Sequence, residues 1–252
     1  MGEPYDPREL SREIHKVVVK GDLRKYYRTS RPGRWYGGIS TADCVGCNLK
    51  CVFCWSGKPR DNPSTIGRFH SAEDIYAELT RCARKFGYGL LRVSGNEPTI
   101  SREHILRLLE LVDGSPYRFI LETNGTLIDQ DFALHLKEFS NAWVRVSLKG
   151  TTAQEFSQLT GAVPMSFDFQ IEALKNLVAR GVKCNGAVML SFSPRENFEK
   201  LKNLIRKIDA HLESTLEEEY ISLYPHVVTR LRKAGVKPLI AFSPEGVPKR
   251  LV

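Results

Sequence analysis

The stretch CVGCNLKCVFCW, residues 44–55, holds four of the six cysteines of a 252-residue chain. They are Cys44, Cys47, Cys51 and Cys54. In a reducing compartment, clustered thiols are more often metal ligands or redox catalysts than disulfides. The segment therefore predicts a metal or redox site.

The spacing of these cysteines is compatible with several kinds of site. A structural zinc site would use all four thiolates, although three residues between the two pairs make a tetrahedral wrap awkward. In the cysteine motif of a ferredoxin-type cluster, the middle spacing is one residue shorter than it is here. A redox dithiol would need only one C-x-x-C pair. A further arrangement leaves out Cys44 and gives Cys47, Cys51 and Cys54 to three irons of a 4Fe-4S cluster, so that the fourth iron is open to a substrate or cofactor.

Strand-like apolar runs and amphipathic segments alternate from residue 36 onward, which predicts an α/β fold with parallel strands and helical crossovers. Segment 216–235 is expected to be mainly helical and divided at Pro225, with a strand ending at Tyr224 as the alternative. Expected helices cover residues 72–86, 102–112, 167–181 and 195–212. Expected strands cover residues 35–41, 90–95, 118–124, 143–148, 184–191 and 238–242.

The chain divides into two parts on composition. Residues 1–34 are basic, and we expect them to form a helical N-terminal extension. Residues 35–252 contain all the alternating elements, without a repeat or a long linker, and we expect them to form one domain.

Charge and hydropathy indicate the kind of partner and the cellular location to expect. The formal net charge of +8 and a pI near 9.2 favour acidic partners such as RNA, nucleotides or an acidic protein face. No apolar run is long enough to span a membrane, and the first ten residues lack the apolar core of a signal peptide. We therefore expect a cytoplasmic protein that is not attached to a membrane.

Further motifs follow the next expected strands at their carboxyl ends, where parallel barrels place their sites. They are SGNEPTI (94–100), LETNGTLI (121–128), VSLKG (146–150) and NGAVMLS (185–191). Ser147 and Lys149 are two residues apart, so an extended backbone would direct both side chains to one face.

Together these motifs resemble the radical S-adenosylmethionine (SAM) superfamily, whose C-x3-C-x2-C loop follows the first strand of a partial (β/α)6 TIM-type barrel. The resemblance covers roughly residues 35–245 and implies that Cys47, Cys51 and Cys54 bind a 4Fe-4S cluster. It implies a cofactor contact for Phe53 near the adenine. The turn after the second strand looks like the family's G-G-E-P element, with Asn96 in place of its second glycine. By resemblance, the other SAM contacts are Gly95, Asn96, Glu97, Thr123, Asn124, Ser147, Lys149, Val188 and Met189.

The same resemblance implies an activity. In this family the reduced cluster splits SAM into methionine and a 5'-deoxyadenosyl radical, which abstracts a hydrogen atom from the substrate. It also implies an electron donor of the ferredoxin or flavodoxin type. The segments at residues 121–127 and 147–162 look like glycyl-radical activating enzymes such as the pyruvate formate-lyase activator, which favours a macromolecular substrate. The segment CVFCWSGKPRDNP, residues 51–63, is similar to the cysteine loop of tRNA wybutosine-synthesis enzymes, so a tRNA base is the alternative. A third hypothesis is a non-catalytic iron-sulfur or zinc-binding interaction protein.

Overall fold

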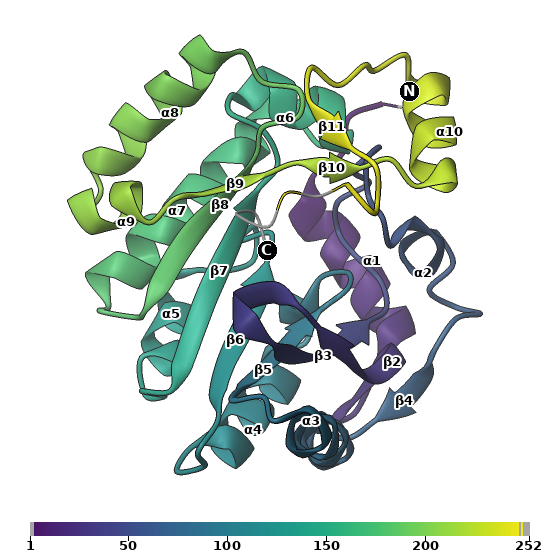
Figure 1. The fold of residues 1–252 in the computed structure, drawn as a ribbon, viewed down its shortest axis with the longest axis vertical. Coiled ribbons are helices and arrows are strands. Elements are labelled where there is room, and N and C mark those ends of the chain that lie inside the picture. The colour runs from purple at the N-terminus through teal and green to yellow at the C-terminus, as the bar shows by residue number, and fades with distance from the viewer. Residues whose placement is uncertain (1–2, 247, 249–252) are drawn as a thin grey trace.

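The structure is a computed structural model that describes residues 3–246 and 248, so the outermost ends of both expected parts lie outside the described residues. Its centre is one nine-stranded sheet, and a second sheet has two strands (Figure 1). The large sheet contains β1 (Val19–Lys20), β2 (Leu23–Gly33), β3 (Ile39–Cys44), β4 (Arg68–His70), β5 (Leu90–Ser94), β6 (Arg118–Thr123), β7 (Ala142–Leu148), β8 (Cys184–Met189) and β9 (Glu217–Glu219). The small sheet pairs β10 (Ile221–Ser222) with β11 (Ala241–Phe242).

Six strands of the large sheet are parallel, in the order β3-β5-β6-β7-β8-β9. Helical crossovers join them, and the first strand of this series, β3, does not pair with the last, β9, so the barrel stays open. The expected partial (β/α)6 barrel is thereby confirmed. In Figure 1, α4, α5, α7 and α8 cover the outer face of the sheet.

The helices follow the amphipathic segments of the sequence. Helix α3 begins with a capping box, in which the Ser71 hydroxyl accepts from the Asp74 backbone N–H and the Asp74 carboxylate accepts from the Ser71 N–H. The expected helix over residues 195–212 is two helices, because Asp209 caps a new one. The helices are α1 (Pro7–Val18), α2 (Gly57–Asp61), α3 (Ala72–Phe86), α4 (Arg102–Val112), α5 (Gln130–Leu136), α6 (Ala153–Thr160), α7 (Phe167–Ala179), α8 (Arg195–Arg206), α9 (Ala210–Ser214) and α10 (Pro225–Ala234), with single 3-10 turns η1 (Trp35–Gly37), η2 (Pro98–Ile100) and η3 (Pro164–Ser166).

The N-terminal segment is helical only in part. Helix α1 is present, but the prediction of helix over the rest of residues 1–34 is wrong, because Leu23–Gly33 forms strand β2. The aromatic pair Tyr26 and Tyr27 favours an extended chain, and Tyr26 is buried against the barrel. Since β2 pairs antiparallel with β3, this segment belongs to the same sheet as the barrel.

The sixth parallel strand also differs from the prediction. Segment 238–242 contributes only β11 of the small sheet, and the sixth strand of the barrel is β9, residues 217–219. Helix begins at Pro225, so the alternative reading of an extended segment before it was the better one. The three glutamates of β9 lack the apolar pattern of a buried strand.

The two faces of the parallel sheet differ in chemistry. Side chains alternate along each strand, and those that face the helices are apolar, such as Leu121, Val144 and Val146, each with 0% exposure. Their neighbours on the inner face include Glu122 and Arg145, which contact one another. The core therefore lies between sheet and helices, and the barrel interior is polar.

All six cysteines are free thiols. Among residues 3–246 and 248, none of the helices has the length and hydrophobicity that crossing a bilayer requires.

Candidate functional site

The cysteine loop leaves the carboxyl end of β3 and runs to α2. Cys47 and Cys54 are partly exposed and Cys51 is buried. Cys44 differs from them because it is the last residue of β3. Neighbouring side chains of a strand point to opposite faces, so Cys44 points away from the barrel interior, which Asp43 faces. Cys44 is fully buried, and none of the groups that shift its pKa is one of the other loop thiols, whereas Cys51 and Cys54 act on the pKa of Cys47. This geometry favours the arrangement that leaves Cys44 out.

The thiols do not converge on one point. Within the described part of the chain, no three or more His, Cys, Asp or Glu side chains could hold a single metal ion. A 4Fe-4S cluster makes a different demand, since each cysteine binds a separate iron.

The electrostatics of the loop fit an iron-sulfur cluster. Burial raises the pKa of Cys51 to about 11. It also raises the pKa of Cys47 well above its usual value, helped by the Glu97 carboxylate and the Cys51 and Cys54 thiolates. Thiolates that repel one another in this way need a cationic group between them, which iron supplies. The Cys47 sulfur also accepts from the Leu49 N–H at 3.4 Å and the Asn124 side-chain amide at 3.9 Å, and such bonds tune cluster potentials.

The turn after β5 is fastened to the cysteine loop. Asn96 Oδ1 accepts from the Gly46 N–H at 2.9 Å, and Asn96 Nδ2 donates to the Ser56 carbonyl at 3.1 Å. Gly95 has φ +97°, and a Cβ there would lie 2.9 Å from the Cα of Asp43, so the close approach requires glycine. Among the described non-glycine residues, only Tyr36 has a positive φ. Asn96 therefore replaces the family's glycine through its side-chain bonds and not through backbone freedom.

Glu97 is engaged entirely by the protein. Its carboxylate accepts from the Thr99 N–H and hydroxyl, from the Thr123 hydroxyl at 2.6 Å and from the Asn124 N–H at 2.8 Å. Glu97 and Thr123 are 1% and 2% exposed. They clamp the turn after β5 to the end of β6, and Asn124 continues the contact to Asn48 in the cysteine loop at 2.8 Å.

Ser147 and Lys149 lie together at the end of β7. Lys149 Nζ donates to the Ser147 hydroxyl at 2.5 Å, and that hydroxyl donates to Glu219 at 2.7 Å. Burial alone would lower the pKa of Lys149, but the Glu219 carboxylate and the Cys51 thiolate outweigh it and raise the pKa. Lys149 therefore lies between the barrel interior and the cysteine loop.

The apolar residues expected beside the adenine do not all face the barrel interior. Met189 pairs in register with Glu219, which faces the barrel interior, so Met189 faces it too. Val188 pairs with Leu148 and faces the helices, which removes it from the interior set. Phe53 packs against Phe192, with ring centroids 5.7 Å apart. Phe192 follows β8, and a strand-end aromatic was the only signal that could have identified it.

The barrel interior holds an ion network that sequence reasoning missed. Arg145 lies 2.8 Å from Glu122, 2.7 Å from Glu217 and 2.8 Å from Glu219, while Arg92 lies 3.5 Å from Glu122. These five residues form the inner ion network. Burial raises the pKa of Glu122, but Arg92 and Arg145 more than offset it, so its pKa is about 2. The alternation of charged and apolar residues in β5, β6 and β7 was its signal.

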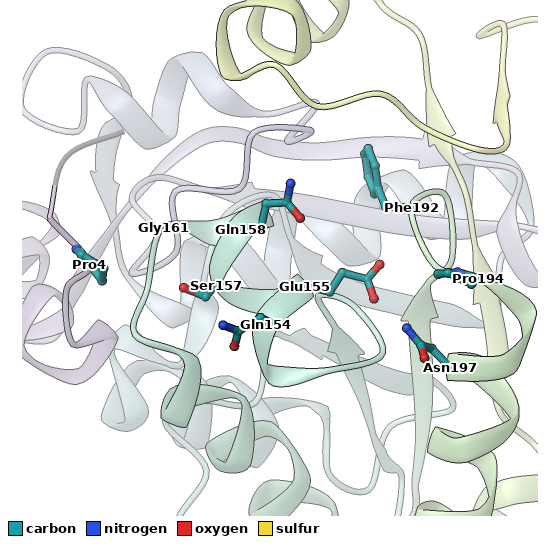
Figure 2. Close-up of a pocket in the computed structure, with 9 residues that line it drawn as sticks. All are labelled: Pro4, Gln154, Glu155, Ser157, Gln158, Gly161, Phe192, Pro194 and Asn197. Atoms are coloured by element: carbon teal, nitrogen blue, oxygen red, sulfur yellow. The ribbon is translucent and has the colours of Figure 1, made fainter.

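A pocket lies beside the cysteine loop, outside the barrel. Figure 2 shows this cavity of about 530 Å³, with Gln158 and neighbouring α6 residues on one side and Phe192 and Asn197 on the other. The cysteine loop packs on the end of α6, where the Val52 N–H donates to the Leu159 carbonyl at 2.9 Å. None of the expected site residues lines the pocket, although its Phe192 contacts Phe53.

Family models and curated sequences both include matches to this chain. A family model described as the radical SAM superfamily matches residues 43–208. Fe-coproporphyrin III synthase of Methanosarcina barkeri is 34% identical over 140 residues, which cover 54% of this chain and 33% of that protein. The chain spans 33% to 59% of the length of the first two curated relatives it matches.

Solved structures share the fold. Streptococcus suis SuiB bound to its precursor peptide SuiA has a TM-score of 0.56 at 18% identity, covering 81% of this chain and 47% of that one. TYW1 with a lysine-pyruvate adduct bound has a TM-score of 0.52 at 11% identity, covering 78% of this chain and 72% of that one. At such identities the likeness shows the fold alone.

Proposed function

The chain belongs to the radical SAM superfamily, and from that premise we propose that it is an enzyme that removes a hydrogen atom from a macromolecular substrate. The family uses a 4Fe-4S cluster and SAM, which when bound supply an electron-driven cleavage of SAM to a 5'-deoxyadenosyl radical. The proposal rests on one observation above all: Cys47, Cys51 and Cys54 share the loop after β3 and are electrostatic neighbours of one another, while Cys44 is the last residue of β3 and is not among those neighbours.

The remaining residues have distinct tasks in this proposal. Cys47, Cys51 and Cys54 would hold three irons, and the backbone of the Gly95–Asn96 turn would bind the methionine amino group. Lys149 is the cation nearest to the loop from the barrel side and is placed to bind the methionine carboxylate. Phe53 and Met189 give apolar walls, which keep water away from a reactive radical.

A protein or peptide is the substrate we favour. SuiB, which shares the fold, is bound to a precursor peptide, and this likeness supports a peptide substrate. The resemblance to glycyl-radical activators at residues 121–127 and 147–162 points the same way. A one-electron donor of the ferredoxin or flavodoxin type in the cytoplasm would complete the system.

A tRNA base is the second candidate, because one edge of the barrel mouth is basic and aromatic. The Arg31 guanidinium lies 5.6 Å from the ring centre of Trp55, directly after Cys54, and Trp55 is 43% exposed. Arginine beside an exposed aromatic ring suits phosphate and base contacts.

Anaerobic reconstitution with iron and sulfide, followed by dithionite and SAM, tests the activity. We expect 5'-deoxyadenosine to form, and its complete absence from cluster-loaded protein would support a non-catalytic iron-sulfur protein instead. The substrate class is tested by adding fractionated cell extract that has been treated with protease or with ribonuclease. Protease should abolish the stimulation of 5'-deoxyadenosine formation, whereas loss only after ribonuclease would favour tRNA.

A further inference from the structure

Two arginines from distant parts of the sequence meet behind the cysteine loop. Arg60 in α2 donates from Nη1 to the Cys51 carbonyl at 2.5 Å and pairs with Asp61 at 2.7 Å and 2.8 Å. Arg230 in α10 donates from Nε to the Val52 carbonyl at 3.3 Å. Helix α10 lies beside α2 in Figure 1, which brings these side chains together.

Arg230 is held in this place by close packing. A Cβ added to Gly57 would lie 1.5 Å from Arg230 Nη1, so the guanidinium occupies the space above the glycine backbone. Helix α10 makes a second contact to the same loop, between His226 Nε2 and the Trp55 carbonyl at 2.8 Å. Two contacts to one loop fix the position of the charged group.

The hydrogen-bonding groups of Arg230 are only partly satisfied by the described residues. Its Nη2 atom is buried and has no hydrogen-bond partner among the described residues. Burial and the positive charge of Arg60 both lower the pKa of Arg230, and they outweigh Cys54, Asp61 and Cys51, which raise it. Asp61 is paired with Arg60, so one carboxylate faces two guanidinium groups, and placing a second, half-buried cation here is costly unless a further anion is present.

We propose that Arg60 and Arg230 form a cationic support for the anionic cluster held by Cys47, Cys51 and Cys54, and that the charge of Arg230 makes the cluster easier to reduce. The inference rests on the proposed function, since it requires the cluster. Three thiolates leave the cluster with net negative charge, and reduction adds one more electron. A nearby fixed cation therefore favours the reduced form, because net charge and hydrogen bonding set cluster potentials. Arg230 is a positioning residue, since it touches the ligand loop and not the substrate.

The test is a redox titration followed by electron paramagnetic resonance on the anaerobically reconstituted full chain. Arg230→Gln should lower the ratio of reduced to oxidised cluster at a fixed potential by about five- to tenfold, and tenfold corresponds to about 59 mV for one electron. Arg230→Lys keeps the charge and should remain within about threefold of the wild type. Arg232→Gln removes an equal charge from the exposed side of the same helix and should leave the ratio unchanged.

Two further readouts separate this role from a structural one. Without the cluster, Arg230→Gln should unfold at a temperature no lower than the wild type, because it removes an uncompensated charge. If Arg230→Gln holds too little cluster to titrate, iron loss to a chelator should be several-fold faster than in Arg230→Lys, whose charge is retained.

An unchanged ratio in fully loaded Arg230→Gln would overturn the proposal. An equal shift, or equally fast iron loss, in Arg230→Lys and Arg230→Gln would overturn it too, because charge would not be the cause. A wild-type chain that binds no cluster at all would overturn the proposed function itself, which is a different result from a cluster of unchanged potential.

Discussion

The inner ion network and the cysteine loop are both groups of buried charge, but only the first is complete in itself. In the barrel interior, Arg92, Arg145 and Lys149 face three carboxylates. At the loop, thiols that raise one another's pKa lie beside two arginines that repel each other. The carboxylates of the network have cationic partners within the protein, whereas burial raises the pKa of Cys47 and Cys51, so these two thiols stay protonated near neutral pH without a metal.

The difference supports the proposal that the cysteine loop is the binding region. The inner ion network links the inner-face side chains of β5, β6, β7 and β9, and Tyr36, in the turn before β3, extends it by donating to Glu217 at 3.1 Å. The cysteine loop is held from outside by Asn96, Arg60 and Arg230, which hydrogen-bond to its backbone. Lys149 lies where the two regions meet.

Removing a cluster thiol should have the largest effect. Serine at Cys47, Cys51 or Cys54 should lower 5'-deoxyadenosine formation by at least about a hundredfold, because each holds a different iron. Iron analysis should show incomplete cluster in the same variants. Cys44→Ala is the matched control and should load iron normally, since Cys44 is in the apolar core. An equal loss of iron in Cys44→Ala would identify Cys44 as a ligand and contradict the assignment of three cysteines.

Removing Arg145 from the inner ion network should lower the stability of the fold and leave cluster loading unchanged. Arg145→Met leaves the carboxylates at positions 122, 217 and 219 without their shared partner and should reduce the free energy of unfolding by about 3–5 kcal/mol. Arg118→Met, at an exposed position at the start of β6, should change it by less than about 0.5 kcal/mol. Denaturant unfolding of both variants measures the difference. Equal stability of the two would mean that the network is not a stabilising unit.

The pH dependence of stability should come from Glu122. Its pKa is depressed from 4.5 to about 2 in the folded chain, so it stabilises the fold above pH 4.5 and loses that contribution as the pH falls toward 2. Glu122→Gln should therefore be less stable than the wild type by roughly 3 kcal/mol near neutral pH, with the gap closing in acid. Unfolding of the cluster-free chain at several pH values measures it. A gap that stays constant with pH would show that the charge of Glu122 is not responsible.

A smaller effect is expected at the turn that fastens the cysteine loop. Asn96→Gly restores the family's residue but removes the bonds to the Gly46 N–H and the Ser56 carbonyl, worth about 2 kcal/mol together. Iron loss to a chelator should be several-fold faster as the loop loosens. Unchanged retention would show that the loop is ordered without these bonds.

The parallel strands were predictable wherever apolar residues decide the pattern. Strands β5 to β8 were expected from their apolar runs, and their outward faces pack on the helices. The sixth strand was missed because Glu217 and Glu219 are held on the inner face by pairing with Arg145, and a search for alternating apolar residues cannot detect such a strand. Strand β2 was missed because its many basic residues resemble the polar face of a helix.

The candidate site was predictable to the extent that its residues are close in sequence. The three cysteines and the turn at residues 95–97 are local motifs. The clamp role of Glu97, the outward direction of Val188 and the meeting of Arg60 with Arg230 depend on strand register and on contacts across the fold, so no single segment encodes them.

The most direct test of the central claim is electron-nuclear double resonance on the reduced, reconstituted chain, with SAM carrying ¹⁵N in its amino group. We predict coupling of that nitrogen to a 4Fe-4S signal in the wild type and in Cys44→Ala, because three cysteines leave one iron open. A cluster signal that is the same with and without SAM, or a metal bound by all four sulfurs of the loop, would contradict the account.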